Sequence, residues 1–105
     1  MKKWQSYNSK IAENTYDVII VGSGIGGLSC AALLALRGQR VLVLEKHFKI
    51  GGWTHTFRRK DYEWDVGIHY VGQVHNLRSP IRKLFDIISD GNLKWSKMDD
   101  NYDRI

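Results

Sequence analysis

A glycine cluster directly after an apolar run is the feature that constrains this chain most. Residues 22–27 (GSGIGG) fit the pattern G-x-G-x-x-G, which is common by itself and gains meaning from its surroundings. Residues 17–21 (DVIIV) are rich in β-branched side chains and predict a parallel strand that is buried on both faces. After the cluster, apolar residues recur at spacings of three and four from Ile25 to Leu36, which predicts a helix that ends before Gly38.

A second apolar run at residues 41–44 (VLVL) predicts another buried strand, so the order of elements is strand, helix, strand. We expect the two strands to be parallel and the crossover between them to be right-handed. Gly22 then allows a tight turn, Gly24 lets the backbone approach a pyrophosphate, and Gly27 lets the helix pack close to the strand. The pyrophosphate would lie at the helix N-terminus, where free N–H groups and the helix dipole favour negative charge.

Glu45 follows the second strand, about twenty positions after the glycine cluster. A carboxylate at this place can accept hydrogen bonds from both ribose hydroxyls of an ADP group, and it would repel the 2′-phosphate of NADP. The cluster and Glu45 together predict an ADP-ribose site that either NAD or FAD could fill. The predicted fold class is therefore α/β, a Rossmann-like FAD/NAD(P)-binding βαβ unit.

The rest of the chain has weaker patterns. Residues 57–62 and 63–71 alternate loosely between polar and aromatic side chains, which predicts two short strands or a hairpin. Ser79-Pro80 predicts the start of a helix, with Ser79 as its N-cap. That helix carries one apolar face, formed by Ile81, Leu84, Phe85 and Ile88. We expect the face to pack on a sheet, and residues 93–95 to begin a further strand.

The basic net charge of +5 does not indicate a nucleic-acid partner, because the sixteen Lys and Arg residues are spread along the chain. The densest group, residues 58–60, is followed at once by Asp61 and Glu63, which is typical of a solvated loop. Neither a signal peptide nor a run of eighteen apolar residues is present. We expect a cytoplasmic protein or one that is peripheral to a membrane.

Cysteine and histidine usage excludes two further kinds of site. Cys30 is the only cysteine, which excludes an internal disulfide, and its place in the first helix predicts a small buried side chain. The four histidines have no metal-ligand spacing, so we expect no metal site.

The chain of 105 residues is short for a complete flavoenzyme. We expect residues 1–15 to form an N-terminal arm and residues 16–105 to form the N-terminal part of an FAD-binding domain, without a substrate domain. The Rossmann-like unit would then be an incomplete part of a larger two-domain flavoprotein.

Beyond Glu45 the chain resembles the flavoprotein family of phytoene desaturases, carotenoid isomerases and retinol saturases (all-trans-retinol 13,14-reductases), which is related more distantly to the amine oxidases. The resemblance rests on a second glycine pair at the end of residues 45–52 (EKHFKIGG), on GWTHTF at 52–57 and on DVGIHY at 65–70. It covers about residues 16–72. A glycine pair lets a second backbone segment approach the cofactor, where side chains would collide.

The resemblance implies FAD as the cofactor, with NAD as the second choice, and a retinoid or carotenoid polyene as the substrate. It implies transfer of hydride equivalents at carbon–carbon double bonds, while the catalytic residues stay unassigned. Gly67 would lie near the flavin, Asp65 and His69 would shape that loop, and His69 is either a proton donor or a structural residue. Trp53 stands where many relatives carry a small or polar residue. The residues expected to bind the cofactor are Gly22, Ser23, Gly24, Ile25, Gly26, Gly27, Glu45, Lys46, Gly51, Gly52, Thr54 and Gly67.

Two alternatives stay open at this point. The chain is either part of an active oxidoreductase or a truncated product that binds nucleotide weakly and catalyses nothing. If it is part of an enzyme, the chemistry is polyene reduction, desaturation, isomerisation or amine oxidation. Peripheral contact with a membrane is compatible with each of these.

Overall fold

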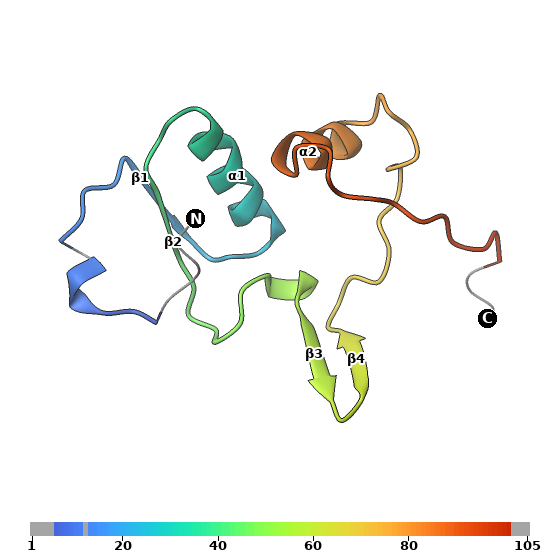
Figure 1. Ribbon diagram of the computed structural model, residues 1–105, viewed down its shortest axis with the longest axis horizontal. Helices are drawn as coiled ribbons and strands as arrows, with labels where there is room; N and C mark the ends of the chain where they lie inside the picture. Colours follow the sequence, from blue (N-terminus) through green and yellow to red (C-terminus); the bar gives the residue numbers. More distant parts are fainter. Residues whose placement is uncertain (1–5, 12, 102–105) are drawn as a thin grey trace.

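The computed structural model describes residues 6–11 and 13–101, so part of the expected arm and residues 102–105 lie outside the described residues (Figure 1). Strands β1 (Val18–Val21) and β2 (Val41–Leu44) pair in parallel, and helix α1 (Ile25–Leu36) connects them. The register runs from Val18 opposite Val41 to Val21 opposite Leu44. The predicted order of strand, helix and strand is confirmed.

The close packing of α1 on β1 depends on a glycine in the first helical turn. A Cβ atom on Gly27 would overlap the carbonyl oxygen of Gly22 and would lie 3.4 Å from the Cγ2 atom of Ile20. Gly22 itself turns the chain out of β1 with a φ of +97°, a conformation that glycine adopts without strain. The steric roles expected for these two glycines are therefore confirmed.

The sheet is less buried than the apolar run predicts. Val18 and Ile20 are half-buried, whereas Ile19 is 58% and Val21 85% exposed, because among the described residues α1 covers only one face of β1. In α1, Leu36 is 64% exposed, so the expected apolar stripe is covered only along part of its length. Cys30 is exposed, so the prediction that it is buried was wrong, since it lies on the uncovered side of the helix.

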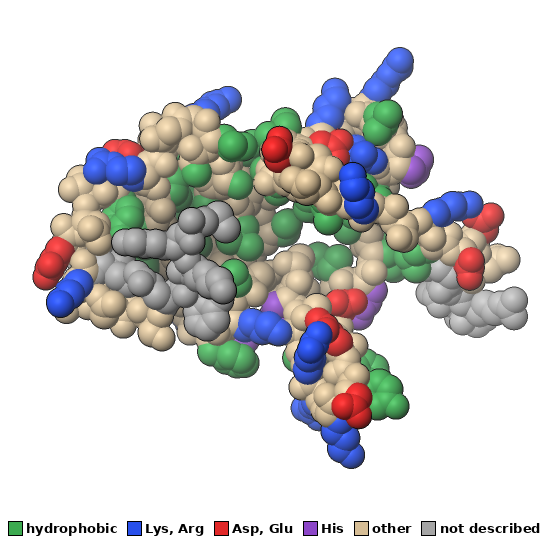
Figure 2. All heavy atoms as spheres, in the orientation of Figure 1, with side chains coloured by type: hydrophobic (Ala, Val, Ile, Leu, Met, Phe, Trp, Pro, Cys, Tyr) green, Lys and Arg blue, Asp and Glu red, His purple; other side chains and the backbone are tan. Residues whose placement is uncertain are grey.

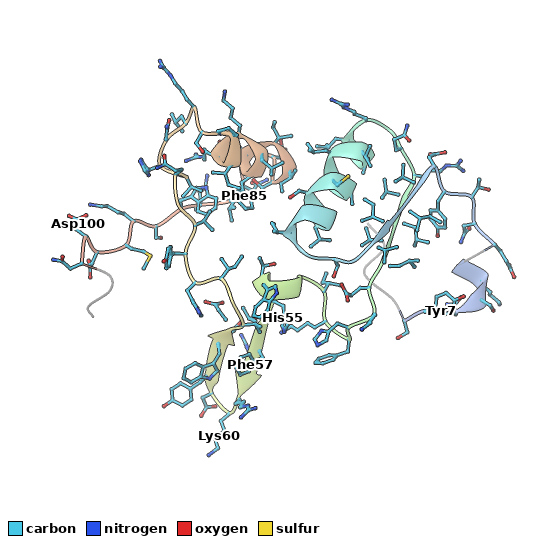
Figure 3. The ribbon with its side chains drawn as sticks, turned by 180° about the vertical axis from the view of Figure 1, so that it is seen from behind. Tyr7, His55, Phe57, Lys60, Phe85 and Asp100 are labelled. Atoms are coloured by element: carbon cyan, nitrogen blue, oxygen red, sulfur yellow. The ribbon has the colours of Figure 1, made fainter. Side chains whose placement is uncertain are left out.

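A short 3-10 helix, η2 (Gly52–Thr54), leads from β2 into the hairpin of β3 (Thr56–Arg59) and β4 (Tyr62–Asp65). The predicted hairpin forms, but its strands are shorter than residues 57–62 and 63–71 and the turn comes at residues 60–61. The hairpin is antiparallel and projects away from the βαβ unit (Figure 1). Figure 3 shows Phe57 and Lys60 along it, with His55 at its base. The basic residues at its tip are partly neutralised, because the Arg58 guanidinium lies 2.6 Å from the Glu63 carboxylate.

Helix α2 (Pro80–Ile88) begins as predicted, with the Ser79 hydroxyl accepting a hydrogen bond from the backbone N–H of Arg82. It contacts α1 rather than a sheet, and Figure 2 shows apolar side chains gathered between the two helices. Residues 93–95 form no strand, so that prediction was wrong. Trp95 instead packs edge-on against Phe85, with ring centroids 5.3 Å apart, which directs this segment along α2.

The described part of the arm contains a short 3-10 helix, η1 (Ser9–Ile11). Within residues 6–11 and 13–101, no helix is long and apolar enough to cross a membrane.

We expect Gly27→Ala to lower the free energy of unfolding by about 1 to 3 kcal/mol, because the added methyl group has to displace backbone atoms of the preceding turn. Gly26→Ala is the matched control, since nothing lies within 4 Å of a Cβ at that position. In a helix it should be neutral or stabilising by up to about 1 kcal/mol. Urea unfolding followed by circular dichroism measures both, and equal effects of the two changes would contradict the packing role of Gly27.

Candidate dinucleotide-binding site

The glycine loop between β1 and α1 presents bare backbone to an open space. The Gly22 N–H donates to the Leu44 carbonyl (2.7 Å), which ties the start of the loop to the end of β2. Gly24 is the N-cap of α1, and neither a capping side chain nor an acidic residue in the first turn occupies this helix end. A Cβ on Gly22, Gly24 or Gly26 would meet nothing within 4 Å. The helix N-terminus is thus accessible to an anion such as a pyrophosphate.

Glu45 lies beside this loop and is held by the protein itself. Its Oε2 atom accepts hydrogen bonds from the Ser23 backbone N–H (2.8 Å) and the Ser23 hydroxyl (2.6 Å). Its Oε1 atom accepts from the backbone N–H of His47 (2.8 Å). The Ser23 hydroxyl, followed by these N–H groups, lowers the pKa of Glu45 to about 2. The carboxylate is therefore anionic at neutral pH.

The contact between Ser23 and Glu45 could not be predicted from the G-x-G-x-x-G pattern, because that pattern allows any residue at position 23. Its side chain is only 1% exposed and is directed at Glu45, not at the open space before α1. A carboxylate has about four acceptor positions, and three hydrogen bonds from the chain already use Glu45. Fewer positions are left for the two ribose hydroxyls than the sequence alone led us to expect.

The second glycine pair packs directly on the first glycine loop. The Gly51 N–H donates to the Ser23 carbonyl (3.0 Å), and Gly24 and Gly51 form an isolated parallel bridge. Gly52 has a φ of +56°, and a Cβ there would lie 3.1 Å from the Cα atom of Gly24. The pair thus lets one backbone segment lie against another, at the place where the cofactor is expected.

Other expected site residues have local structural contacts. The Thr54 hydroxyl donates to the Gly51 carbonyl (2.6 Å) and closes η2, while the exposed Lys46 contributes its backbone N–H to the low pKa of Glu45. Gly67 lies against the ring of Trp53, where a Cβ would overlap the indole. The Trp53 ring therefore needs a glycine at position 67. This contact joins η2 to the segment after β4.

Asp65, His69 and Ile25 are the remaining residues expected near the cofactor. The Asp65 carboxylate lies 3.7 Å from the Nδ1 atom of His69, and both side chains are solvent-accessible. Ile25, the first residue of α1, is 40% exposed at the mouth of the glycine loop. Within the described part of the chain, no group of three or more His, Cys, Asp or Glu side chains could hold a metal ion.

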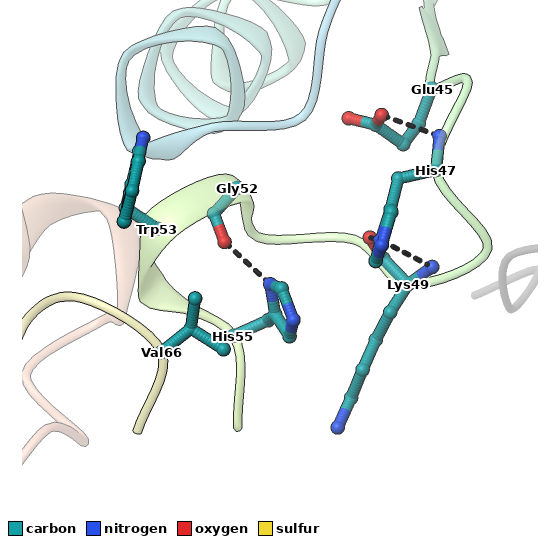
Figure 4. Close-up of a pocket in the computed structure, with 7 residues that line it drawn as sticks. All are labelled: Glu45, His47, Lys49, Gly52, Trp53, His55 and Val66. Atoms are coloured by element: carbon teal, nitrogen blue, oxygen red, sulfur yellow. Dashed lines mark hydrogen bonds between the residues drawn. The ribbon is translucent and has the colours of Figure 1, made fainter. Parts of the chain in front are cut away.

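An open depression of about 220 Å³ lies beside Glu45 (Figure 4). Its shape is set by backbone contacts of two histidines: Nδ1 of His55 lies 2.6 Å from the Gly52 carbonyl, and Nδ1 of His47 lies 3.2 Å from the Lys49 N–H. The sequence does not predict it, because the residues come together only when the 46–55 loop folds. Its lining consists of Glu45, His47, Lys49, Gly52, Trp53, His55 and Val66.

Comparison with known proteins places this geometry in context. Residues 20–88 match the family described as NAD(P)-binding Rossmann-like domain. The chain is 44% identical over 97 residues to all-trans-retinol 13,14-reductase of Danio rerio, covering 92% of this chain and 16% of that relative. It is 41% identical over 75 residues to a flavin-containing amine oxidase of Danio rerio, covering 70% and 14%. It is 54% identical over 52 residues to the chloroplastic prolycopene isomerase 2 of an Oncidium hybrid cultivar, covering 50% and 9%.

A solved structure shows the same fold. A crystal structure of a Pyrococcus furiosus protein superposes with a TM-score of 0.57 at 31% identity, covering 69% of this chain and 18% of that chain. The resemblance expected from the second glycine pair and from residues 65–70 is confirmed by the relatives. The chain spans about one sixth of the length of the retinol reductase that it matches.

The hydrogen bonds to Glu45 predict a specific loss of stability in acid. The folded-state pKa of Glu45, about 2, lies below the ordinary 4.5. Its contribution to the free energy of unfolding is therefore fully present above about pH 4.5 and is lost as the pH falls through about 2. Asp17 and Glu63 also have lowered pKa values, through Arg40 and Arg58, and cause a further loss in the same direction.

We therefore expect Glu45→Gln to flatten, but not abolish, the fall of stability over this pH range. Urea midpoints measured at half-unit pH steps for both chains test this. A variant whose stability falls as steeply as that of the unsubstituted chain would show that Glu45 is not held as described.

Proposed function

The chain belongs to the family of NAD(P)-binding Rossmann-like domains, and from this premise we propose that it supplies the ADP-binding part of an FAD-dependent oxidoreductase. The observation that carries the proposal is the meeting of three segments at one end of the parallel sheet. The glycine loop after β1, Glu45 after β2 and the pair Gly51-Gly52 are joined there by hydrogen bonds. In open α/β sheets, ligands bind outside the carboxyl ends of the strands.

The residues at this place fit the ADP part of a dinucleotide. The backbone of residues 22–27 would hold the pyrophosphate, since no Cβ fills the space before α1. Glu45 would accept a ribose hydroxyl and would disfavour a 2′-phosphate. When bound, FAD supplies the hydride chemistry, and the chain supplies binding and orientation. FAD is favoured over NAD by the similarity to a flavin-containing amine oxidase.

We propose the carbon–carbon double bonds of a hydrophobic polyene as the reacting groups. Relatives named as a retinol 13,14-reductase and a prolycopene isomerase support this substrate class. The proposal includes peripheral contact with a membrane, from which an apolar substrate is supplied. Amine oxidation is the competing chemistry, because an amine oxidase matches over 70% of the chain.

A second candidate function is nucleotide binding without turnover by residues 1–105 on their own. The depression beside Glu45, at about 220 Å³, is smaller than the roughly 300 to 1,000 Å³ of common ligand pockets. The surface before α1 is also open, since a Cβ on Gly22, Gly24 or Gly26 would meet no protein atom within 4 Å. On this view residues 16–105 form the first part of an FAD-binding domain and residues 1–15 form an arm.

Flavin retention tests the cofactor assignment. We expect Gly24→Val to abolish retention of FAD, because its side chain would fill the space in front of the helix N-terminus while meeting no protein atom within 4 Å at its Cβ. Gly72→Val is the control, since that position is equally open and lies outside the site. The absorbance of bound flavin after gel filtration measures retention. Equal retention by the unsubstituted chain and Gly24→Val would refute the assignment.

Product analysis separates the candidate reactions. With FAD and a reductant or oxidant supplied, we expect no turnover of retinol, phytoene or an amine by residues 1–105, because the open depression beside Glu45, at about 220 Å³, is smaller than common ligand pockets. Chromatography of each mixture is the measurement. Turnover would refute the second candidate, and the substrate consumed would distinguish polyene reduction, desaturation or isomerisation from amine oxidation.

A further inference from the structure

Ser23 is buried inside a loop whose neighbouring residues face open space. Its side chain is 1% exposed, and it is the largest fully buried side chain among the described residues. The hydroxyl donates to Oε2 of Glu45 (2.6 Å) and accepts from the Gly51 N–H (3.2 Å). One hydroxyl thus connects the glycine loop, the acid after β2 and the second glycine pair.

These contacts are specific to Ser23 and do not follow from burial alone. Ser29, in α1, is also buried, at 7% exposure, but its hydroxyl has no hydrogen-bond partner among the described residues. Ser23 additionally donates its backbone N–H to the same Glu45 oxygen (2.8 Å). Two donors from one residue on one carboxylate oxygen restrict both the position and the rotation of the carboxylate.

We infer that Ser23 is a positioning residue for nucleotide recognition, which holds the Glu45 carboxylate so that its other oxygen, Oε1, is directed to the ribose. The Ser23 side chain itself does not touch the nucleotide, because its hydroxyl is bonded to Glu45 and Gly51. This inference rests on the proposed function, because it assigns Glu45 to the ribose. The G-x-G-x-x-G pattern leaves this position unspecified, so the residue found there would tune the affinity of the site.

The same contacts also set the pKa of Glu45. The Ser23 hydroxyl is the largest cause of the low pKa of Glu45, so its removal should raise that pKa toward 4.5. The other titratable side chains that line the depression with Glu45 are His47, Lys49 and His55, and Lys46 is next to it in the sequence. None of these four side chains carries a carboxyl group, so the NMR signal of the Glu45 carboxyl group can be followed separately from them.

The test compares Ser23→Ala with the matched control Ser29→Ala in the full chain. Calorimetric titration with FAD and with ADP should show affinity about tenfold weaker for Ser23→Ala and unchanged for Ser29→Ala. In a Glu45→Gln background, Ser23→Ala should cost little further affinity, because the group that it positions has changed. Ser23→Cys has a side chain of similar size with a weaker donor, so its affinity should lie between those of Ser23→Ala and the unsubstituted chain. It decides the outcome if Ser23→Ala does not fold.

A second readout needs no ligand. Carbon-13 NMR of the Glu45 carboxyl group during acid titration should show a higher pKa in Ser23→Ala than in the unsubstituted chain and in Ser29→Ala. If the unsubstituted chain binds neither FAD nor ADP, the proposed function fails, and the positional role of Ser23 is judged by this titration. If the chain binds nucleotide but Ser23→Ala matches Ser29→Ala in affinity and in the titration, the inference is overturned.

Discussion

The hydrogen bonds between Ser23 and Glu45 are the contacts on which the arrangement of the candidate site depends. They fix the end of β2 to the loop after β1, and the Gly51 N–H adds the third segment through the same serine. A carboxylate held by donors of its own chain stays charged and ordered without a ligand. The nucleotide would therefore meet a largely preformed acceptor, which reduces the entropy cost of binding.

Close backbone approach is the second constraint, and glycine makes it possible at two places. Gly27 brings α1 onto β1, and Gly52 brings the chain after β2 onto Gly24. A Cβ at Gly27 would overlap the Gly22 carbonyl oxygen, and a Cβ at Gly52 would lie 3.1 Å from the Cα atom of Gly24, so each contact depends on the missing side chain. The glycine loop leaves bare backbone open before α1, and the face of β1 away from α1 is also left uncovered by the described residues, with Val21 at 85% exposure.

Local patterns predicted the elements well, because neighbouring residues decide them. The β-branched run, the helical spacing and the Ser79 cap each specify a conformation over a few residues, and β1, α1, β2 and α2 follow them. The errors concern burial and pairing between distant segments. Cys30 is exposed, and Trp95 packs on Phe85 instead of starting a strand, since both outcomes depend on which surfaces meet.

The βαβ unit, its glycine loop and the acid after the second strand could all be predicted from the sequence, because spacing along the chain sets each of them. Three contacts became known only from the folded chain: Ser23 faces Glu45, Gly51-Gly52 lies on the first loop, and Trp53 covers Gly67. Those contacts join residues more than ten positions apart. Their geometry depends on how the segments pack, and short-range periodicity carries no information about that packing.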